Sequence, residues 1–155
     1  MNQANSSEVK EILIGSWLAD LSNFCAYYFE SVVDLNWVGF YFSDGQKLVL
    51  GPFQGKMACT TIEFNRGVCG AAFSEKIIKC VPDVHEFKDH IACDTASRSE
   101  LVIPLFFKNE VFGVLDVDSP KLNRFSQIEV DLFSEGVKTL LNKNPSLHLV
   151  STYLK

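Results

Sequence analysis

The sequence predicts an α+β fold, in which hairpins build an antiparallel sheet and a helix lies near each end of the chain. Two observations support this prediction. The candidate strands follow one another in pairs joined by short turns, whereas a parallel sheet would separate them with helices. Strong helical periodicity occurs near the two ends of the chain. The 155 residues, 47% of them hydrophobic, fit one domain over 1–155 with a core of about 8–143.

Residues 8–32 are predicted to form the first helix. Apolar residues recur there at the three- and four-residue spacing of one buried face. They are Val9, Ile12, Leu13, Trp17, Leu18, Leu21, Phe24, Cys25, Tyr28 and Phe29. Because Cys25 falls on this apolar face, we interpret it as a small core residue.

The next segments predict strands. Residues 36–42 are rich in aromatic and β-branched side chains, and a turn at 43–45 leads into a second strand at 47–50, which together form a hairpin. Gly51 and Pro52 are expected to end this second strand. Residues 57–64 are then expected to form another strand.

The middle of the chain is less regular. Residues 67–72 are small and flanked by Gly, which suggests the start of a short helix, and 77–81 are expected to form a strand that ends at Pro82. Cys80 lies inside that strand and is interpreted as a core residue. Residues 82–99 form the longest stretch without clear periodicity, and such loops are usually functional or mobile.

Regular patterns return in the last third of the chain. Residues 101–107 and 111–117 are expected to pair as a second hairpin. Ser126 and Glu129 have the spacing of a capping box, which predicts the start of a terminal helix, and Pro145 is expected to end it.

Composition excludes several classes of function. The chain carries 14 basic and 19 acidic residues, for a net charge of −5, without the basic stripe that nucleic-acid binding requires. No apolar run approaches the roughly 20 residues that cross a bilayer. The N-terminal segment lacks the pattern of a signal peptide, so a cytoplasmic protein without a membrane partner is expected. Its five cysteines are therefore more readily free, metal-bound or catalytic than structural.

Metal, phosphate and hydrolase motifs are absent from the sequence. His85, His90 and Cys93 form a loose group whose spacing matches no common zinc pattern, so no metal site is expected. The pair Gly67 and Gly70 lacks the Lys-Ser/Thr of a phosphate-binding P-loop. No G-x-S-x-G nucleophile elbow occurs either. Thiol chemistry remains the candidate.

Three cysteines have the surroundings that thiol chemistry needs. Cys59, Cys69 and Cys93 each stand beside small or polar residues at the edge of a periodic segment. A reactive thiol needs space for approach and a partner that favours the thiolate, and such edges can offer both. From these residues alone, an unreactive structural role stays an equal alternative for each of them.

Two acidic residues follow an apolar strand at alternating positions. Asp116 and Asp118 are therefore expected on one face of the strand. They could be a solvated strand end, or neighbouring carboxylates of which one is held protonated or binds an ammonium group. Glu100 begins another strand, and Arg98 could be its surface ion-pair partner.

An aromatic pair has the same kind of spacing. Trp37 and Tyr41 are four residues apart on a predicted strand and so share a face. They could belong to the core or line a pocket for a methyl group or a cation. Spacing does not decide between these alternatives.

Taken together, six segments resemble the free methionine-R-sulfoxide reductases, a family built on the GAF domain. The segments follow in order over almost the whole chain, and several are long and contain rare residues. They are NWVGFYF (36–42), LGPFQGKMAC (50–59), RGVCG (66–70), VPDVHEF (81–87), HIACDTASRSE (90–100) and GVLDVDSP (113–120). The chain departs from the family at Asn65, where Gly is usual, and at Lys88-Asp89, where a Pro-Gly pair is common. The second change could alter the stiffness of the loop.

The resemblance implies a GAF-like sheet with the N- and C-terminal helices packed on one face, a pocket on the other, and usually a homodimer. It implies thiol-dependent reduction of free L-methionine (R)-S-oxide to L-methionine. Cys93 is then the nucleophile, which becomes a sulfenic acid. Cys59 is the main resolving thiol, which forms an intramolecular disulfide with it, and Cys69 is an alternative or auxiliary partner.

The resemblance also assigns the polar and aromatic residues. It implies that Glu100, Asp116 and Asp118 bind the amino group and the sulfoxide oxygen of the substrate, and that a protonated carboxyl among them acts as the acid. Trp37 and Tyr41 form an aromatic wall near the methyl end. No cofactor is implied, and thioredoxin is the expected reductant. The alternative is a non-enzymatic GAF domain that senses a small ligand or redox state.

Overall fold

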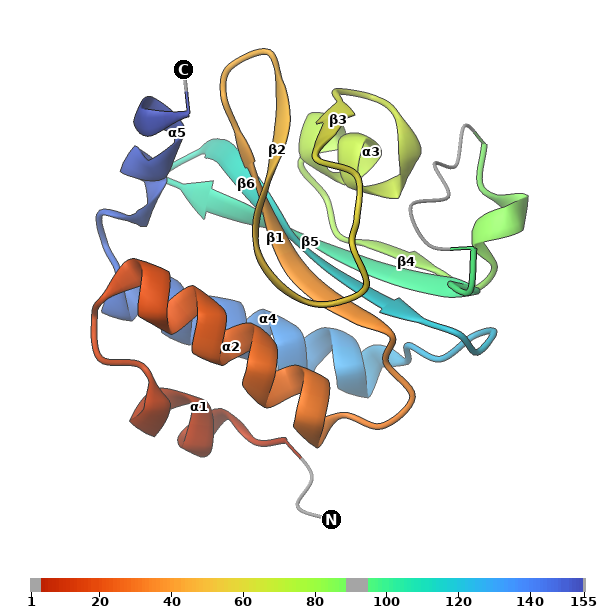
Figure 1. Cartoon of the computed structure of the whole chain (residues 1–155), viewed down its shortest axis with the longest axis horizontal. Helices are drawn as coiled ribbons and strands as arrows, with labels where there is room; N and C mark the ends of the chain where they lie inside the picture. Colours follow the sequence, from red (N-terminus) through yellow and green to blue (C-terminus); the bar gives the residue numbers. More distant parts are fainter. Residues whose placement is uncertain (1–3, 89–94, 155) are drawn as a thin grey trace.

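The computed structural model, which describes residues 4–88 and 95–154, contains one six-stranded sheet with the strand order β3-β2-β1-β6-β5-β4 (Figure 1). All neighbouring strands are antiparallel. The elements are α1 (Ser6–Ile12), α2 (Trp17–Ser31), β1 (Trp37–Ser43), β2 (Lys47–Gly55), β3 (Thr61–Glu63), α3 (Gly67–Glu75), β4 (Lys79–Val81), η1 (Val84–Glu86), β5 (Ser99–Phe107), β6 (Glu110–Ser119), α4 (Gln127–Lys143), η2 (Leu147–Leu149) and α5 (Val150–Tyr153). The predicted α+β class is confirmed.

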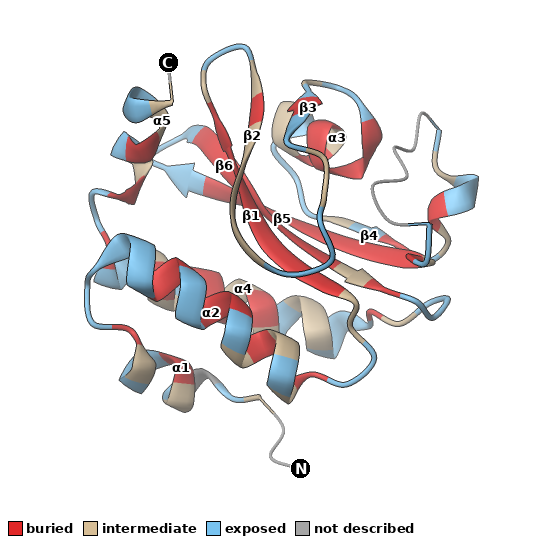
Figure 2. Cartoon of the chain, viewed as in Figure 1, coloured by how far each residue is buried: buried red, intermediate tan, exposed pale blue. Residues whose placement is uncertain are grey.

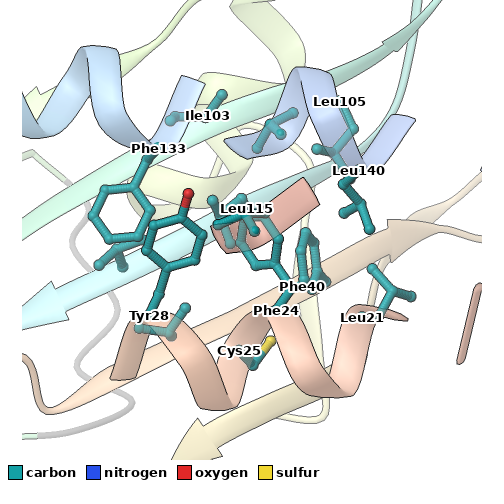
Figure 3. Close-up of a cluster of buried hydrophobic side chains, with 14 of the residues drawn as sticks. Leu21, Phe24, Cys25, Tyr28, Phe40, Ile103, Leu105, Leu115, Phe133 and Leu140 are labelled. Atoms are coloured by element: carbon teal, nitrogen blue, oxygen red, sulfur yellow. The ribbon is translucent and has the colours of Figure 1, made fainter. Parts of the chain in front are cut away.

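The helices α1, α2 and α4 lie together on one side of the sheet, and α3 lies on the other side, near the edge strand β3 (Figure 1). α2 and α4 each bury one side and expose the other (Figure 2). Their buried sides and the facing strands form the larger core, which includes Phe24, Tyr28, Phe40 and Phe133 (Figure 3). A second apolar cluster, on the α3 side, contains Trp37 and Tyr41. The described part of the chain contains no helix that is long and apolar enough to cross a membrane.

Both predicted hairpins and the capped terminal helix are confirmed. β1 pairs with β2, β5 pairs with β6, and Ser126 and Glu129 form the expected capping box at the start of α4. The short helix predicted from residue 67 is α3. Asn65, two residues before the start of α3, has a φ of 64°. Asn enters this left-handed region more readily than other residues with a side chain, which explains how the chain accommodates it there.

The single helix predicted over 8–32 is wrong, because α1 and α2 are separate helices. Gly15 breaks the chain between them with a φ of +84°. The buried carboxylate of Asp20 accepts hydrogen bonds from the backbone N–H groups of Ile14 (2.9 Å) and Gly15 (2.8 Å). The side-chain amide of Asn144 donates to the same carboxylate at 2.8 Å. Apolar periodicity continues across this break, so periodicity alone did not reveal it.

Three residues predicted for the core are exposed instead. They are Trp17 (43% exposed), Leu18 (55% exposed) and Cys80. The break before α2 changes the phase of the buried face, so its first turn faces solvent. Cys80 lies on the short strand β4, which pairs only with β5 at the end of the sheet. A strand of three residues is too short for alternation to predict which side is buried.

The second strand is also longer than predicted. Gly51 and Pro52 do not end β2, which continues to Gly55. The register between β1 and β2 shifts between Gly39 and Tyr41, opposite this Gly-Pro pair. A bulge can accommodate a proline within a sheet because no ladder hydrogen bond is then lost. The strand predicted over 57–64 contracts to β3.

Candidate active site

A pocket of about 520 Å³, including the space at its mouth, opens on the α3 side of the sheet. Six of the eight predicted site residues line it, from β1, α3, β5 and β6. They are Trp37, Tyr41, Cys69, Glu100, Asp116 and Asp118. The predicted placement of a pocket opposite the terminal helices therefore agrees with the structure.

Strand pairing brings the acidic residues together. Glu100 on β5 lies directly across from Asp118 on β6, and Asp118 in turn lies across from Trp37 on β1. Asp116 points to the same side as Asp118, as the alternation of a strand requires, and both line the pocket. The sequence could predict this shared side, but the approach of Glu100 depends on the register between β5 and β6.

The aromatic wall is a stacked group. The ring centroids of Trp37 and Tyr41 lie 5.9 Å apart at an interplanar angle of 24°, and Phe53 also stacks on Trp37, with a centroid distance of 5.3 Å. Gly39, between the two wall residues on β1, leaves room for the indole. A Cβ atom there would lie 2.3 Å from the Trp37 ring and 2.4 Å from Cβ of Phe53. The pair is therefore both core and pocket wall.

A thiol and two carboxyl groups meet at the base of the pocket. Cys69, Glu100 and Asp116 each offer one ligand-type atom, and these atoms all lie within 4.8 Å of one another. The Cys69 thiol donates to Oε1 of Glu100 at 3.9 Å. All three side chains are buried, and Oδ1 of Asp116 has no hydrogen-bond partner among the described residues. We call this set the acid–thiol cluster.

Burial controls protonation in the acid–thiol cluster. Burial raises the pKa of Glu100 well above its usual range, and the Asp116 and Asp118 carboxylates raise it further. Burial also raises the pKa of Asp116 to about 6, although hydrogen bonds from Cys69 and Glu100 oppose the rise. The Cys69 pKa is raised by burial first and then by the neighbouring carboxylates. The raised pKa values thus favour the protonated form of Glu100 and the neutral thiol of Cys69.

These groups can bind a cation or supply a proton. One sulfur and two carboxylate oxygens would suit a borderline-soft cation such as zinc better than magnesium or calcium. The expectation of no metal rested on sequence spacing. Spacing could not reveal this cluster, because its members come from α3, β5 and β6. The protonated Glu100 can equally act as a general acid toward a bound substrate.

The remaining two predicted site residues are the cysteines Cys59 and Cys93, of which the structure describes only Cys59. Cys59 is disulfide-bonded, and its neighbour Ala58 lines the pocket. Cys25, Cys69 and Cys80 are free thiols. Cys93, the predicted nucleophile, lies in the segment 89–94, outside the described residues.

The predicted site residues did not include seven others that line the pocket. Met57, Arg66 and Ser97 are three of them. The Ser97 hydroxyl accepts a hydrogen bond from the Asn36 side chain at 3.0 Å. Met57 is 91% exposed at the mouth of the pocket. All three stand within or beside the segments that carry the family resemblance, which was the available signal.

Comparison with known proteins agrees with this geometry. The GAF domain family model matches residues 18–137. The free methionine-R-sulfoxide reductase of Escherichia coli (strain K12) is 44% identical over 140 residues, covering 90% of this chain and 82% of that protein. The Saccharomyces cerevisiae enzyme of the same name is 40% identical over 137 residues, covering 83% and 76%.

A solved structure of a protein with the same name as these relatives also matches the chain. The free methionine-R-sulfoxide reductase from Neisseria meningitidis, in complex with its substrate, superimposes with a TM-score of 0.88 at 36% identity. The match covers 97% of this chain and 97% of that one. The family model and the two relatives, each aligned over most of their length, agree with it. The chain therefore belongs to the free methionine-R-sulfoxide reductases, a family of GAF-domain proteins.

Proposed function

We propose that this protein reduces free L-methionine (R)-S-oxide to L-methionine with cysteine thiols. The observation that carries the proposal is the acid–thiol cluster, which faces the stacked Trp37 and Tyr41 rings in one pocket. A sulfoxide substrate needs both features, because its oxygen must be protonated and its methyl group must be held. Relatives at 44% and 40% identity are named for this activity.

The first step needs an acid. A sulfoxide oxygen leaves poorly until it is protonated, so attack on sulfur and proton transfer must occur together. We assign the attack to the Cys93 thiolate and the proton to Glu100, whose raised pKa favours the protonated form that can donate it. The attack forms a bond between the Cys93 sulfur and the substrate sulfur. The protonated oxygen then moves to the Cys93 sulfur, as the substrate sulfur loses its bonds to both the oxygen and Cys93. Methionine leaves, and Cys93 becomes a sulfenic acid.

We also propose that the pocket prefers the free amino acid. We assign the Asp116 and Asp118 carboxylates, which line the pocket, to the α-ammonium group of the substrate, which a methionine inside a peptide lacks. A buried carboxylate left unpaired makes binding of the wrong substrate costly. The faces of Trp37 and Tyr41 provide an apolar contact for the methyl end of the side chain.

The second step resolves the sulfenic acid. The Cys59 thiol displaces hydroxide from sulfenic Cys93, a proton completes the departing water, and a disulfide forms. Participation of Cys59 in a disulfide supports this role. Cys69 is less suited to be the main resolving thiol, because burial and neighbouring carboxylates disfavour its thiolate. It serves as a hydrogen-bond donor to Glu100 and as an auxiliary thiol.

The test is direct. Purified protein is incubated with dithiothreitol and each diastereomer of free methionine sulfoxide, and free methionine is measured. We expect turnover of the R form alone, no turnover of a peptide-bound sulfoxide, and loss of activity in Cys93→Ser. Cys80→Ser, which removes an exposed thiol outside the pocket lining, is the matched control and should retain activity.

Two results would contradict the proposal. Full activity in Cys93→Ser would exclude the assigned nucleophile. Binding of methionine sulfoxide without any turnover by the unaltered protein would favour a GAF sensor instead.

We further propose that a thioredoxin-type dithiol reduces the disulfide, that the protein works in the cytoplasm, and that it is a homodimer. A dithiol reductant regenerates both thiols by exchange through a mixed disulfide. Replacement of dithiothreitol by thioredoxin and its reductase should sustain turnover, with consumption of the nicotinamide reductant as the readout. Sedimentation equilibrium measures the assembly state.

A further inference from the structure

The segment 56–60 between β2 and β3 carries Cys59 and is fastened to the aromatic wall of the pocket. The Trp37 indole Nε1–H donates to the backbone carbonyl of Lys56 at 3.1 Å. The Tyr41 hydroxyl donates to the backbone carbonyl of Cys59 itself at 3.0 Å. The wall thus holds this segment near both of its ends. We call the segment the Cys59 loop.

We propose that Trp37 and Tyr41 are positioning residues for Cys59, in addition to their contact with substrate. Their ring faces line the pocket, whereas their polar edges hold the loop that brings the resolving thiol to the sulfenic acid. The inference rests on the proposed function, since it assigns these residues to the second of its two chemical steps.

The two donors are themselves rigidly held. Trp37 is 3% exposed and Tyr41 is 1% exposed, and the two rings stack on each other. Glycines lie against the indole from two strands. A Cβ at Gly39 would overlap the ring at 2.3 Å, and one at Gly55 would lie 2.7 Å from it. Gly55 also has a φ of +127°, which only glycine adopts readily, and it directly precedes Lys56.

This rigidity matters because the resolving step depends on proximity. Cys59 must reach the sulfenic sulfur before dithiothreitol, water or a second oxidant does, and the rate of an intramolecular step depends strongly on how the groups are held. A loop without its two anchors would sample more conformations, and fewer of them would place Cys59 for attack. Loss of one anchor should therefore slow disulfide formation more than it slows methionine release.

Tyr41→Phe tests this directly, because it removes one hydroxyl and keeps the ring. A single-turnover reaction without external reductant is quenched at successive times. Methionine release reports the first step, and loss of the alkylatable Cys59 thiol, measured by mass spectrometry, reports the second. One neutral hydrogen bond corresponds to about a three- to tenfold effect, so disulfide formation should slow by that factor relative to methionine release. Dimedone should then trap more sulfenic acid than in the unaltered protein.

Tyr27→Phe is the matched control. The Tyr27 hydroxyl donates to Oε2 of Glu8 at 2.8 Å, among the N-terminal helices on the opposite side of the sheet. The same chemical change there should leave the ratio of the two rates unaltered. An unchanged ratio in Tyr41→Phe, or an equal slowing of both steps, would overturn the inference.

A peroxide arm separates this inference from the proposed function. Hydrogen peroxide converts a thiolate to a sulfenic acid and releases water, so disulfide formation can be followed without any sulfoxide. If the unaltered protein releases no methionine, the proposed function fails. Slower peroxide-driven disulfide formation in Tyr41→Phe would still support the positioning role, and an unchanged rate would refute it. Should Tyr41→Phe not fold, Trp37→Phe removes the other donor and is measured in the same way.

Discussion

Replacement of Asp116 by asparagine is expected to stabilise the folded protein at neutral pH, although it removes a group needed for substrate binding. Asp116 is 7% exposed, and its Oδ1 has no hydrogen-bond partner among the described residues. Burial raises its pKa from 3.8 to about 6. A rise of that size corresponds to ~3 kcal/mol by which the ionised carboxylate opposes folding. Asparagine has a similar shape and no charge to desolvate.

The direction of the Asp116 pKa shift determines the pH range over which this carboxyl group lowers the free energy of unfolding. Below about pH 4 the carboxyl group is protonated in both the folded and the unfolded chain, and it contributes nothing. As the pH rises, the unfolded chain ionises first, so the free energy of unfolding falls until Asp116 ionises in the folded protein near pH 6. The raised pKa of Glu100 acts in the same direction. The unaltered protein should thus lose stability across this window, and Asp116→Asn should lose less.

Urea unfolding of the disulfide-bonded protein at about pH 4 and about pH 7.5 measures this difference. We expect Asp116→Asn to gain about 1–3 kcal/mol at the higher pH and little at the lower one. Asp131→Asn, on the exposed side of α4, removes the same charge and should change neither value appreciably. If Asp116→Asn is less stable by the same amount at both pH values, the carboxylate is a net stabilising hydrogen-bond acceptor and the reasoning is refuted.

Three further variants have defined outcomes. Glu100→Gln should slow single-turnover methionine release by about 10²–10⁴-fold, and it should abolish the fall in rate that the unaltered protein shows as pH rises through the Glu100 pKa. Gly39→Ala should displace the Trp37 indole, which a new Cβ would approach to 2.3 Å, and so raise the KM for the sulfoxide and change tryptophan fluorescence. Gly136→Ala should lower the free energy of unfolding by about 1–3 kcal/mol in a urea titration with normal KM, because its Cβ would lie 2.1 Å from the buried Tyr28 hydroxyl.

The sequence predicted well wherever a short pattern determines the local structure. Alternation placed Asp116 and Asp118 on one side of β6 and Trp37 and Tyr41 on one side of β1, and the pocket contains all four. The capping box predicted the start of α4 for the same reason, since its hydrogen bonds join residues three apart.

Features that depend on contacts between distant residues could not be predicted this way. The break before α2 is stabilised by Asn144, which lies 124 residues from its partner Asp20. The acid–thiol cluster requires α3 to lie over β5 and β6, and no spacing within the sequence encodes that placement. The bulge at Gly51 and Pro52 is a feature of the register between β1 and β2, which the residues of β2 alone do not encode. Only the family resemblance pointed to Cys69 and Glu100 together.

The two sides of the sheet explain how the chain can support an unfavourable site. The acid–thiol cluster buries two carboxyl groups with few compensating hydrogen bonds, which costs folding free energy of a few kcal/mol. On the other side, large side chains such as Phe24, Tyr28 and Phe133 are fully buried, and each contributes about 1.5–3 kcal/mol. Two or three such residues offset the cluster. The acid–thiol cluster and the helical core have only the strands of the sheet in common. Variants of the helical core should therefore alter stability without altering the pKa values that the chemistry requires.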